Sequence, residues 1–177
     1  MTTPPVFVSG AILTAAQMNA VGLWLYKTQT ISSGATTVTV TGAFSSDYDN
    51  YLVTVSNGSL TSNQAIFLRL GSKVTGYRSQ LNYAAYANTP LSVGTTTATS
   101  FDYAMPGSTT GMFGYMNIGS PFLTQNTFFS STWNSNTEAG TFVGNANDTT
   151  SYTAFTLGAG GGATFTGGTI NVYGYTK

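Results

Sequence analysis

Short runs in which apolar and polar residues alternate make up most of the chain after residue 35, and this pattern constrains the fold most strongly. In residues 36–41, valine and threonine alternate with a period of two, as expected of a strand with one buried face. Similar runs cover residues 51–56, 65–70, 77–86, 98–103, 111–118, 126–133, 139–143, 152–157 and 169–175. Glycine, proline, asparagine and aspartate separate these runs and are typical of turns.

The number and spacing of these runs predict an all-β protein. Nine or ten short strands within 177 residues favour a single antiparallel β-sandwich of jelly-roll type. Strands do not alternate with helical patterns, which argues against a parallel α/β fold. We therefore expect the sandwich domain to cover residues 30–177.

Residues 1–29 precede this pattern and are predicted to form an N-terminal arm with one short helix. Thr14 followed by Gln17 matches a capping box, and Leu13 with Met18 fits the hydrophobic staple that accompanies it. A helix of two to three turns is marginal by itself, so we expect it to dock on the body, on a neighbouring copy or on another protein. The candidate anchoring residues are Val6, Phe7, Val8, Ile12, Leu13, Met18, Val21, Leu23, Trp24 and Leu25.

The scarcity of charge and the absence of two residue types exclude several classes of function. The chain has 5 basic and 5 acidic residues and neither histidine nor cysteine. It therefore lacks a disulfide framework, a Cys-based zinc site, a thiol nucleophile and a Ser-His-Asp triad. Five basic side chains are too few to track a phosphate backbone, so we expect no nucleic acid as a partner. No apolar run is long enough to span a bilayer, so we expect no membrane insertion.

Zero net charge gives little electrostatic protection against self-association. We therefore expect a homo-oligomer or a subunit of a larger assembly. The first five residues lack the basic segment of a secretory signal, so we expect the chain to be made in a cytoplasm.

The acidic residues offer little catalytic chemistry. Asp47 and Asp49 are close in sequence, but aspartate and asparagine also form turns before strands, and we favour the turn. Their oxygens would suit calcium, although the glycine and distal glutamate of an EF-hand loop are missing. The glycine-rich run at residues 158–162 lacks the GK[ST] ending of a phosphate-binding loop. The sequence therefore predicts no enzyme, no metal site and no cofactor.

Aromatic rings beside amide side chains are typical of a sugar-binding face, where rings stack and amides bind hydroxyls. Aromatic residues on strands also fill sandwich cores, and we expect this role for Phe128, Phe142, Phe155 and Phe165. The candidate glycan contacts are Trp133, Asn134, Asn136, Tyr86 and Tyr152. For Trp133, both the glycan contact and a core position stay open.

Three segments, in this order, resemble parts of bacteriophage tail and fibre proteins. Residues 10–19 (GAILTAAQMN) resemble the attachment segment G-x-x-L-T-A-x-x-[LM]-N at the start of many of these proteins. Residues 43–51 (AFSSDYDNY) resemble the F-S-x-x-Y-x-x-Y segment that leads into their β-sandwich domains. Residues 165–175 (FTGGTINVYGY) are similar to their closing strand, G-x-I-x-[VIL]-Y-G.

The resemblance implies a structural protein of the virion, commonly a homotrimer, that is assembled in the host cytoplasm. In such a protein the arm binds other virion proteins, and the sandwich contacts host surface glycans or neighbouring subunits. The chain has no collagen-like or coiled shaft, so a short tail fibre or tail-associated adhesin is expected rather than a long fibre. A capsid decoration protein or head fibre is the alternative. A stand-alone carbohydrate-binding module would not need the apolar arm.

Overall fold

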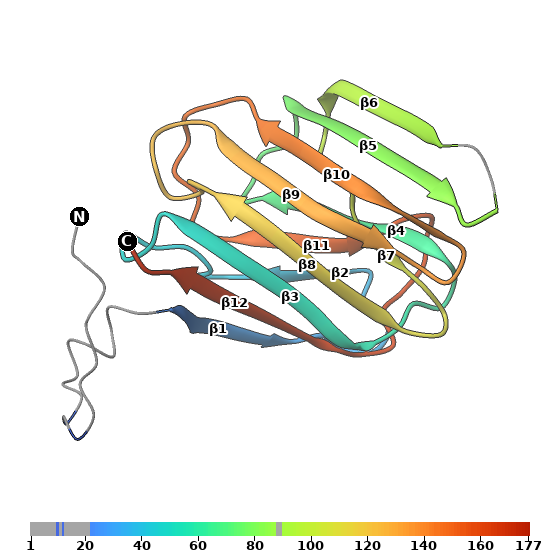
Figure 1. Cartoon of the computed structure of the whole chain (residues 1–177), viewed down its shortest axis with the longest axis horizontal. Helices are drawn as coiled ribbons and strands as arrows, with labels where there is room; N and C mark the ends of the chain where they lie inside the picture. The colour runs from blue at the N-terminus through green and yellow to red at the C-terminus, as the bar shows by residue number, and fades with distance from the viewer. Residues whose placement is uncertain (1–9, 11, 13–21, 88–89) are drawn as a thin grey trace.

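The computed structural model describes residues 10, 12, 22–87 and 90–177, and these residues form strands and no helix (Figure 1). The strands are β1 (Leu23–Thr30), β2 (Thr37–Val40), β3 (Asn50–Gly58), β4 (Gln64–Leu70), β5 (Tyr77–Ala85), β6 (Leu91–Ala98), β7 (Phe101–Gly107), β8 (Met112–Gly119), β9 (Thr127–Asn134), β10 (Glu138–Ala146), β11 (Phe155–Ala159) and β12 (Thr169–Tyr175). A search of this part of the chain finds no helix long and apolar enough to cross a membrane.

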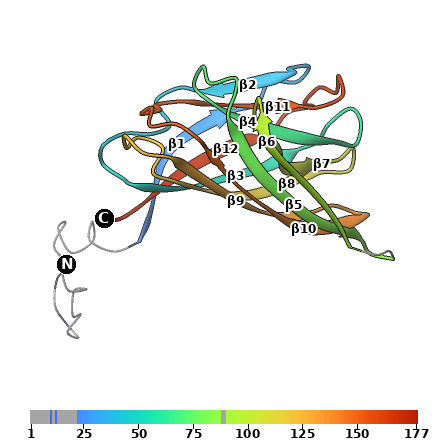
Figure 2. The same cartoon turned by 90° about the horizontal axis from the view of Figure 1, so that it is seen from above.

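The strands form two antiparallel sheets, which Figure 2 shows as two layers. The eight-stranded sheet has the order β1-β12-β3-β8-β9-β10-β5-β6, and the four-stranded sheet has the order β2-β11-β4-β7. The pairing is nested along the chain, because β5 pairs with β6, β4 with β7, β3 with β8, and β2 with β11. The β9–β10 hairpin lies between β8 and β5, and β12 and β1 extend the sheet beyond β3.

Aromatic side chains from both sheets meet in the core. Phe101 of β7, in the four-stranded sheet, lies 4.8 Å from the Tyr77 ring and 4.7 Å from the Phe129 ring, measured between centroids. Tyr77 and Phe129 belong to β5 and β9 of the eight-stranded sheet. All three side chains are buried. The inner faces of the two sheets therefore pack directly on each other, as the alternating pattern of the sequence requires.

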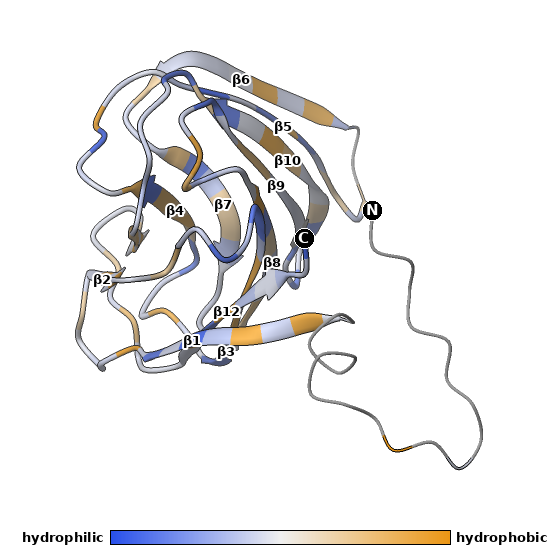
Figure 3. Cartoon of the chain, turned by 90° about the vertical axis from the view of Figure 1, so that its left-hand side faces the viewer, coloured by the Kyte–Doolittle hydropathy of each residue, from blue (hydrophilic) through white to orange (hydrophobic). Residues whose placement is uncertain are grey.

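Each of the ten alternating runs overlaps a strand of the structure, so the all-β prediction is confirmed. The sequence pattern missed β1 and β6. Strand β6 lies at the edge of the eight-stranded sheet and is mostly exposed, so its sequence, LSVGTTTA, carries no alternation between a buried and an exposed face. Strand β1 does alternate, as its coloured bands show (Figure 3), but its apolar residues also continue the helical spacing of the arm.

The boundary predicted after residue 29 is corrected to residue 22. Strand β1 pairs with β12 from Leu23↔Tyr175 to Thr30↔Thr169, so it belongs to the eight-stranded sheet. The spacing of apolar residues suggests that Leu25 continues the helix of the arm. The strand is favoured instead, because it forms backbone hydrogen bonds with β12 and half-buries Trp24. The predicted helix after Thr14 lies outside the described residues.

The predicted core aromatics are correct except for one. Phe142, Phe155 and Phe165 are at most 1% exposed, whereas Phe128 is 55% exposed. Phe128 and Phe129 are adjacent on β9, so their side chains point to opposite faces of the sheet. The odd-numbered residues Thr127, Phe129 and Ser131 of β9 are buried, so Phe129 and not Phe128 lies in the core.

The strands run between two ends of the molecule. The proximal end contains Leu23, where the chain enters β1, and the C-terminal residue Lys177, which is marked C in Figure 1. The distal end is the opposite end, formed by the β1–β2, β3–β4, β5–β6, β7–β8, β9–β10 and β11–β12 connections. The other connections, β2–β3, β4–β5, β6–β7, β8–β9 and β10–β11, are the proximal loops. All strands of the eight-stranded sheet run from one of these ends to the other. In β3 and β8, for example, Tyr51 pairs with Ile118 near the proximal end, and Val55 pairs with Gly114 nearer the distal end.

Candidate functional site

The second and third motifs pack on each other at the proximal end. The Tyr48 ring lies against the backbone of Gly174, where an added Cβ would come within 2.2 Å of a ring carbon. Tyr48 also contacts the Tyr51 ring at 5.9 Å, and Tyr51 contacts the Phe44 ring at 4.9 Å. The Tyr51 hydroxyl donates to the Ser45 carbonyl at 3.0 Å and accepts from the Ser45 amide at 2.8 Å. The motif residues therefore form one structural joint between the loop before β3 and the end of β12.

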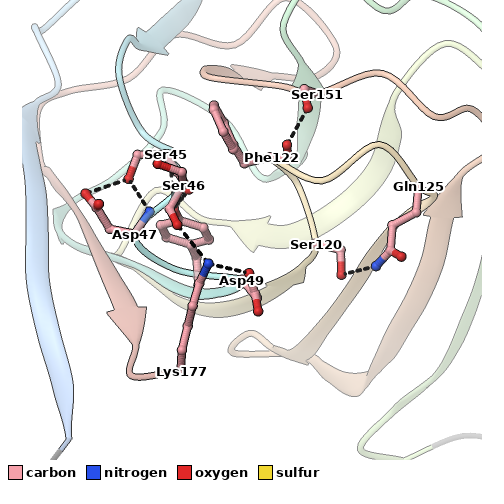
Figure 4. A network of polar contacts seen from close by, with 10 residues as sticks. Ser45, Ser46, Asp47, Asp49, Ser120, Phe122, Gln125, Ser151 and Lys177 are labelled. Carbon is pink, nitrogen blue, oxygen red and sulfur yellow. Dashed lines mark hydrogen bonds and ion pairs between the residues drawn. The ribbon is translucent and has the colours of Figure 1, made fainter. Parts of the chain in front are cut away.

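Polar contacts cross-link the loops of the proximal end (Figure 4). Lys177 donates to the Ser46 carbonyl at 2.8 Å and forms an ion pair with Asp49 at 3.0 Å. The Ser45 hydroxyl donates to Asp47 at 3.0 Å and accepts from the Asp47 amide at 3.2 Å, so the turn predicted here is confirmed. Among the described residues, no group of three acidic side chains could hold a metal ion.

A partly buried ion pair fastens the β4–β5 loop to the β10–β11 loop at the same end. Lys73 Nζ lies 2.6 Å from Asp148 Oδ2, and these side chains are 10% and 29% exposed. The Tyr152 hydroxyl donates to the same carboxylate oxygen at 2.7 Å. Burial by itself raises the pKa of Asp148, but the hydrogen bonds from Lys73 and Tyr152 outweigh it, so this pKa lies below its ordinary value. Burial and the bond to Asp148 raise the pKa of Tyr152.

Charge is distributed very unevenly between the two ends. Eight of the ten charged residues lie in the proximal loops or within two residues of them: Asp47, Asp49, Arg69, Lys73, Arg78, Asp102, Asp148 and Lys177. Lys27 lies in the middle of β1, and Glu138, at the start of β10, is the one charged residue of the distal end.

Two cavities open at the distal end, on either side of the β9–β10 turn. Cavity A has a volume of about 250 Å³ and lies between β5, β7 and that turn. Cavity B has a volume of about 690 Å³ and lies between the end of β3, the start of β8 and the end of β9. Pro106, Ser108, Ser135 and Asn136 line both, so the cavities share one wall.

Cavity B combines exposed rings with amide side chains. Phe113 and Tyr115 of β8 are 58% and 48% exposed, and their ring centroids lie 4.7 Å apart in an edge-to-face arrangement. Asn57, Asn134 and Asn136 supply amides to the same cavity. The Asn136 amide donates to the Thr110 hydroxyl at 2.6 Å, which ties the β9–β10 turn to the β7–β8 loop.

Cavity A has half-buried rings and the distal carboxylate. Tyr83 and Tyr103 line it together with Asn63, Gln64 and Glu138. Asn63 accepts a hydrogen bond from the Thr109 amide at 3.0 Å, which positions the β7–β8 loop against the start of β4. Ser135 accepts from the Glu138 amide at 3.2 Å and so holds the short turn in which Glu138 lies.

The structure brings three of the predicted glycan contacts together and separates one. Asn134 and Asn136 line cavity B, and the exposed Tyr86 hydroxyl donates to the Ser135 carbonyl at 3.2 Å. Tyr152 is corrected: it is only 5% exposed and lies at the proximal end, where its hydroxyl binds Asp148. Trp133 lies in β9, where its backbone pairs with Gly140, and its side chain is outside the described part of the structure.

The predicted anchoring residues fall in two groups. Leu23 and Leu25 are 39% and 57% exposed on β1, with Trp24 half-buried between them. Ile12 is exposed. Val6, Phe7, Val8, Leu13, Met18 and Val21 lie outside the described residues.

Sequence reasoning missed the rings and the carboxylate of the distal end. Phe113 and Tyr115 lie at the outward-facing positions of β8, where polar residues are expected, whereas Met112 and Met116 are buried. Two aromatic residues in the outward phase of a strand were the signal that could have identified them. Glu138 carried no comparable signal, because only the fold brings it into the lining of the same cavity as Tyr83.

The distal end can therefore hold a polar, largely uncharged ligand with flat apolar faces. Rings supply stacking surfaces, and amides and hydroxyls supply donors and acceptors. Comparison of the chain with protein-family models, curated proteins and solved structures finds no match.

Proposed function

We propose that the two sheets form a jelly-roll sandwich. The support is the nested pairing, since a jelly roll arises when a long antiparallel hairpin of eight strands folds over into two sheets. Strands β2 to β8 and β11 supply the eight strands and the four nested pairs. In this interpretation the β9–β10 hairpin is an insertion, and β1 and β12 are additions at one edge.

We propose that the protein is a non-enzymatic structural protein of a bacteriophage virion, a short tail fibre or tail-associated adhesin. The carrying observation is the separation of the two ends. The chain enters the sheet at Leu23 at the proximal end, whereas both cavities open at the distal end. An adhesin needs this arrangement, because its ligand-binding surface must point away from its attachment.

In this proposal the arm before Gly22 and the exposed Leu23 and Leu25 contact other virion proteins. The packing of Tyr48 on Gly174 supports the family resemblance, since it gives two of the three motifs a shared structural role near Leu23, where the chain enters β1. The homotrimer is part of the proposal and follows from that resemblance alone. The distal end is exposed in the virion and binds host surface glycans.

Labelling on intact virions tests the location. We expect an antibody against the folded body to label tails. Labelling of heads would instead favour the capsid decoration protein, and absence from purified virions would contradict both locations.

A truncation tests the anchor. Deleting residues 1–21 keeps Gly22, whose carbonyl accepts a hydrogen bond from the Thr176 hydroxyl at 2.7 Å. We expect this variant to remain folded by circular dichroism and to be lost from virions. Normal incorporation of the truncated chain would contradict the anchoring role of the arm.

Glycan binding is tested separately with the full chain on a glycan array. We expect binding that Phe113→Ala weakens, whereas Phe128→Ala on the same outer face does not. Binding without any virion association would favour a stand-alone carbohydrate-binding module.

A further inference from the structure

We infer that the distal site selects uncharged saccharides and rejects anionic ones such as sialic acids, uronic acids and sulfated sugars. This inference rests on the proposed glycan binding and specifies its ligand class. It follows from the charges that the fold places around the two cavities.

Glu138 is the one charged residue among those that line cavities A and B. The two cavities contain no lysine or arginine, because four of the five basic residues lie at the proximal end and Lys27 lies in β1. Proteins bind carboxylates and sulfates through arginine, lysine or clusters of backbone amides. The distal end offers no basic side chain for this purpose.

A single carboxylate in a cavity acts against an anionic ligand in two ways. The anion is repelled by Glu138, and this repulsion is stronger in a cavity partly enclosed by protein than in bulk water. The anion also loses water of hydration without gaining a positive partner. An uncharged sugar loses less on desolvation, because its hydroxyls can donate to Glu138 and exchange hydrogen bonds with the amides of Asn63 and Asn136.

The dimensions of the site indicate more than one sugar unit. Cavity A, at about 250 Å³, suits a single hexose ring, and cavity B, at about 690 Å³, suits a longer segment. The shared wall of Ser135 and Asn136 separates them. A neutral oligosaccharide that crosses this wall would stack on Phe113 and Tyr115 in cavity B and place one ring beside Glu138 in cavity A.

Matched pairs of oligosaccharides test the inference with the full chain. Each neutral oligosaccharide is compared by titration calorimetry with a counterpart in which one sugar carries a carboxylate or sulfate, such as lactose with lactose sulfated on its galactose. We expect the neutral member of at least one pair to bind about tenfold more tightly, which corresponds to about 1.4 kcal/mol. Binding of the neutral member should change little with salt, because no ion pair contributes to it.

The Glu138→Gln variant tests the source of the discrimination. It keeps the size of the side chain and removes the charge, so the preference for the neutral member should fall by about threefold or more. Asp49→Asn removes a charge at the proximal end and should leave the preference as in the wild type. A preference that Glu138→Gln does not change would overturn the role of Glu138.

The outcomes separate this inference from the proposed function. Equal or tighter binding of the anionic members would overturn the selection for uncharged sugars and leave glycan binding intact. Absence of binding to every neutral and anionic oligosaccharide on a broad array would overturn both.

Discussion

The two ends of the molecule are built from the same strands but differ in charge, packing and hydrogen bonding. At the proximal end, Lys73–Asp148 and Lys177–Asp49 ion pairs cross-link loops, and the Tyr48 ring closes on Gly174. At the distal end, two cavities open between loops, and uncharged side chains line them together with Glu138.

Under the proposed function, this difference assigns stability to the proximal end and ligand binding to the distal end. Ion pairs and packed rings hold the proximal loops to each other, which suits an end that transmits load to an attachment. Uncharged amides and exposed rings at the distal end leave surface available for a ligand. Substitutions at the two ends should therefore change different measured quantities.

The largest effect on stability is expected from Phe101 of β7, and Tyr103 of the same strand is the comparison. Phe101 is fully buried among Tyr77, Phe129 and Phe142, so Phe101→Ala should lower the free energy of unfolding by about 3–5 kcal/mol. Tyr103, two residues nearer the distal end, lines cavity A, so Tyr103→Ala should cost less than half as much. Urea denaturation measures both. Equal losses would show that the distal end is packed as tightly as the proximal end.

The next effect concerns the ion pairs. Asp148→Asn leaves Lys73, which is 10% exposed, without its partner and should lower the free energy of unfolding by about 2–4 kcal/mol. Asp49→Asn breaks a pair whose side chains are 47% and 42% exposed and should cost less than about 1 kcal/mol. Similar losses from both variants would contradict the role of burial.

The same pair gives the protein a predictable pH dependence. The folded-state pKa of Asp148 lies below its ordinary value of 3.8, so the pair stabilises the fold above that value and is lost as the pH falls through the folded-state pKa. Burial raises the pKa of Tyr77 from 10.0 to about 12, so stability should also fall as the pH rises over that range. Thermal unfolding from pH 2 to pH 12 measures the loss of stability at both extremes. Asp148→Asn should remove the acid dependence and also weaken the alkaline one, because Asp148 contributes to the raised pKa of Tyr152 and of Tyr77.

A smaller effect tests the joint between the two motifs. Gly174→Ala adds a Cβ that meets the Tyr48 ring and should lower the free energy of unfolding by about 1–3 kcal/mol. In a Tyr48→Ala background the clash is absent, so the same substitution should cost much less. Additive losses in the double variant would show that this contact does not couple the segments.

The smallest effect on stability is expected at the distal end. Phe113 is 58% exposed, so Phe113→Ala should change the free energy of unfolding by no more than about 0.5 kcal/mol. The same variant should weaken glycan binding, which Asp148→Asn should not do when measured on the folded protein. Loss of stability without loss of glycan binding in Phe113→Ala would contradict the comparison between the ends.

The amount that could be predicted from the sequence depended on whether a feature was periodic. Strands such as β3 and β8 show strict alternation, and their positions were predicted within a few residues. Strand β6 shows none, since it lies at an edge and exposes both faces. Phe128 and Phe129 are adjacent apolar residues, so alternation alone could not decide which of the two is buried.

The candidate site was predicted only in part, because its residues come from separate strands. Asn134 and Asn136 were identified as neighbours in sequence, and the β9–β10 turn places both at the distal end. Tyr152 was grouped with them on residue type, but the β10–β11 loop carries it to the opposite end.

By itself, the sequence determined the all-β class, the turn at Asp47 and the absence of histidine and cysteine chemistry. These properties are local or compositional, so they do not depend on which strands become neighbours. Only the tertiary structure decided that eight charged residues gather at the proximal end and that Glu138 lies alone beside a cavity. This arrangement follows from the strand order and register, because they bring residues that are far apart in the chain next to each other when the two sheets pack.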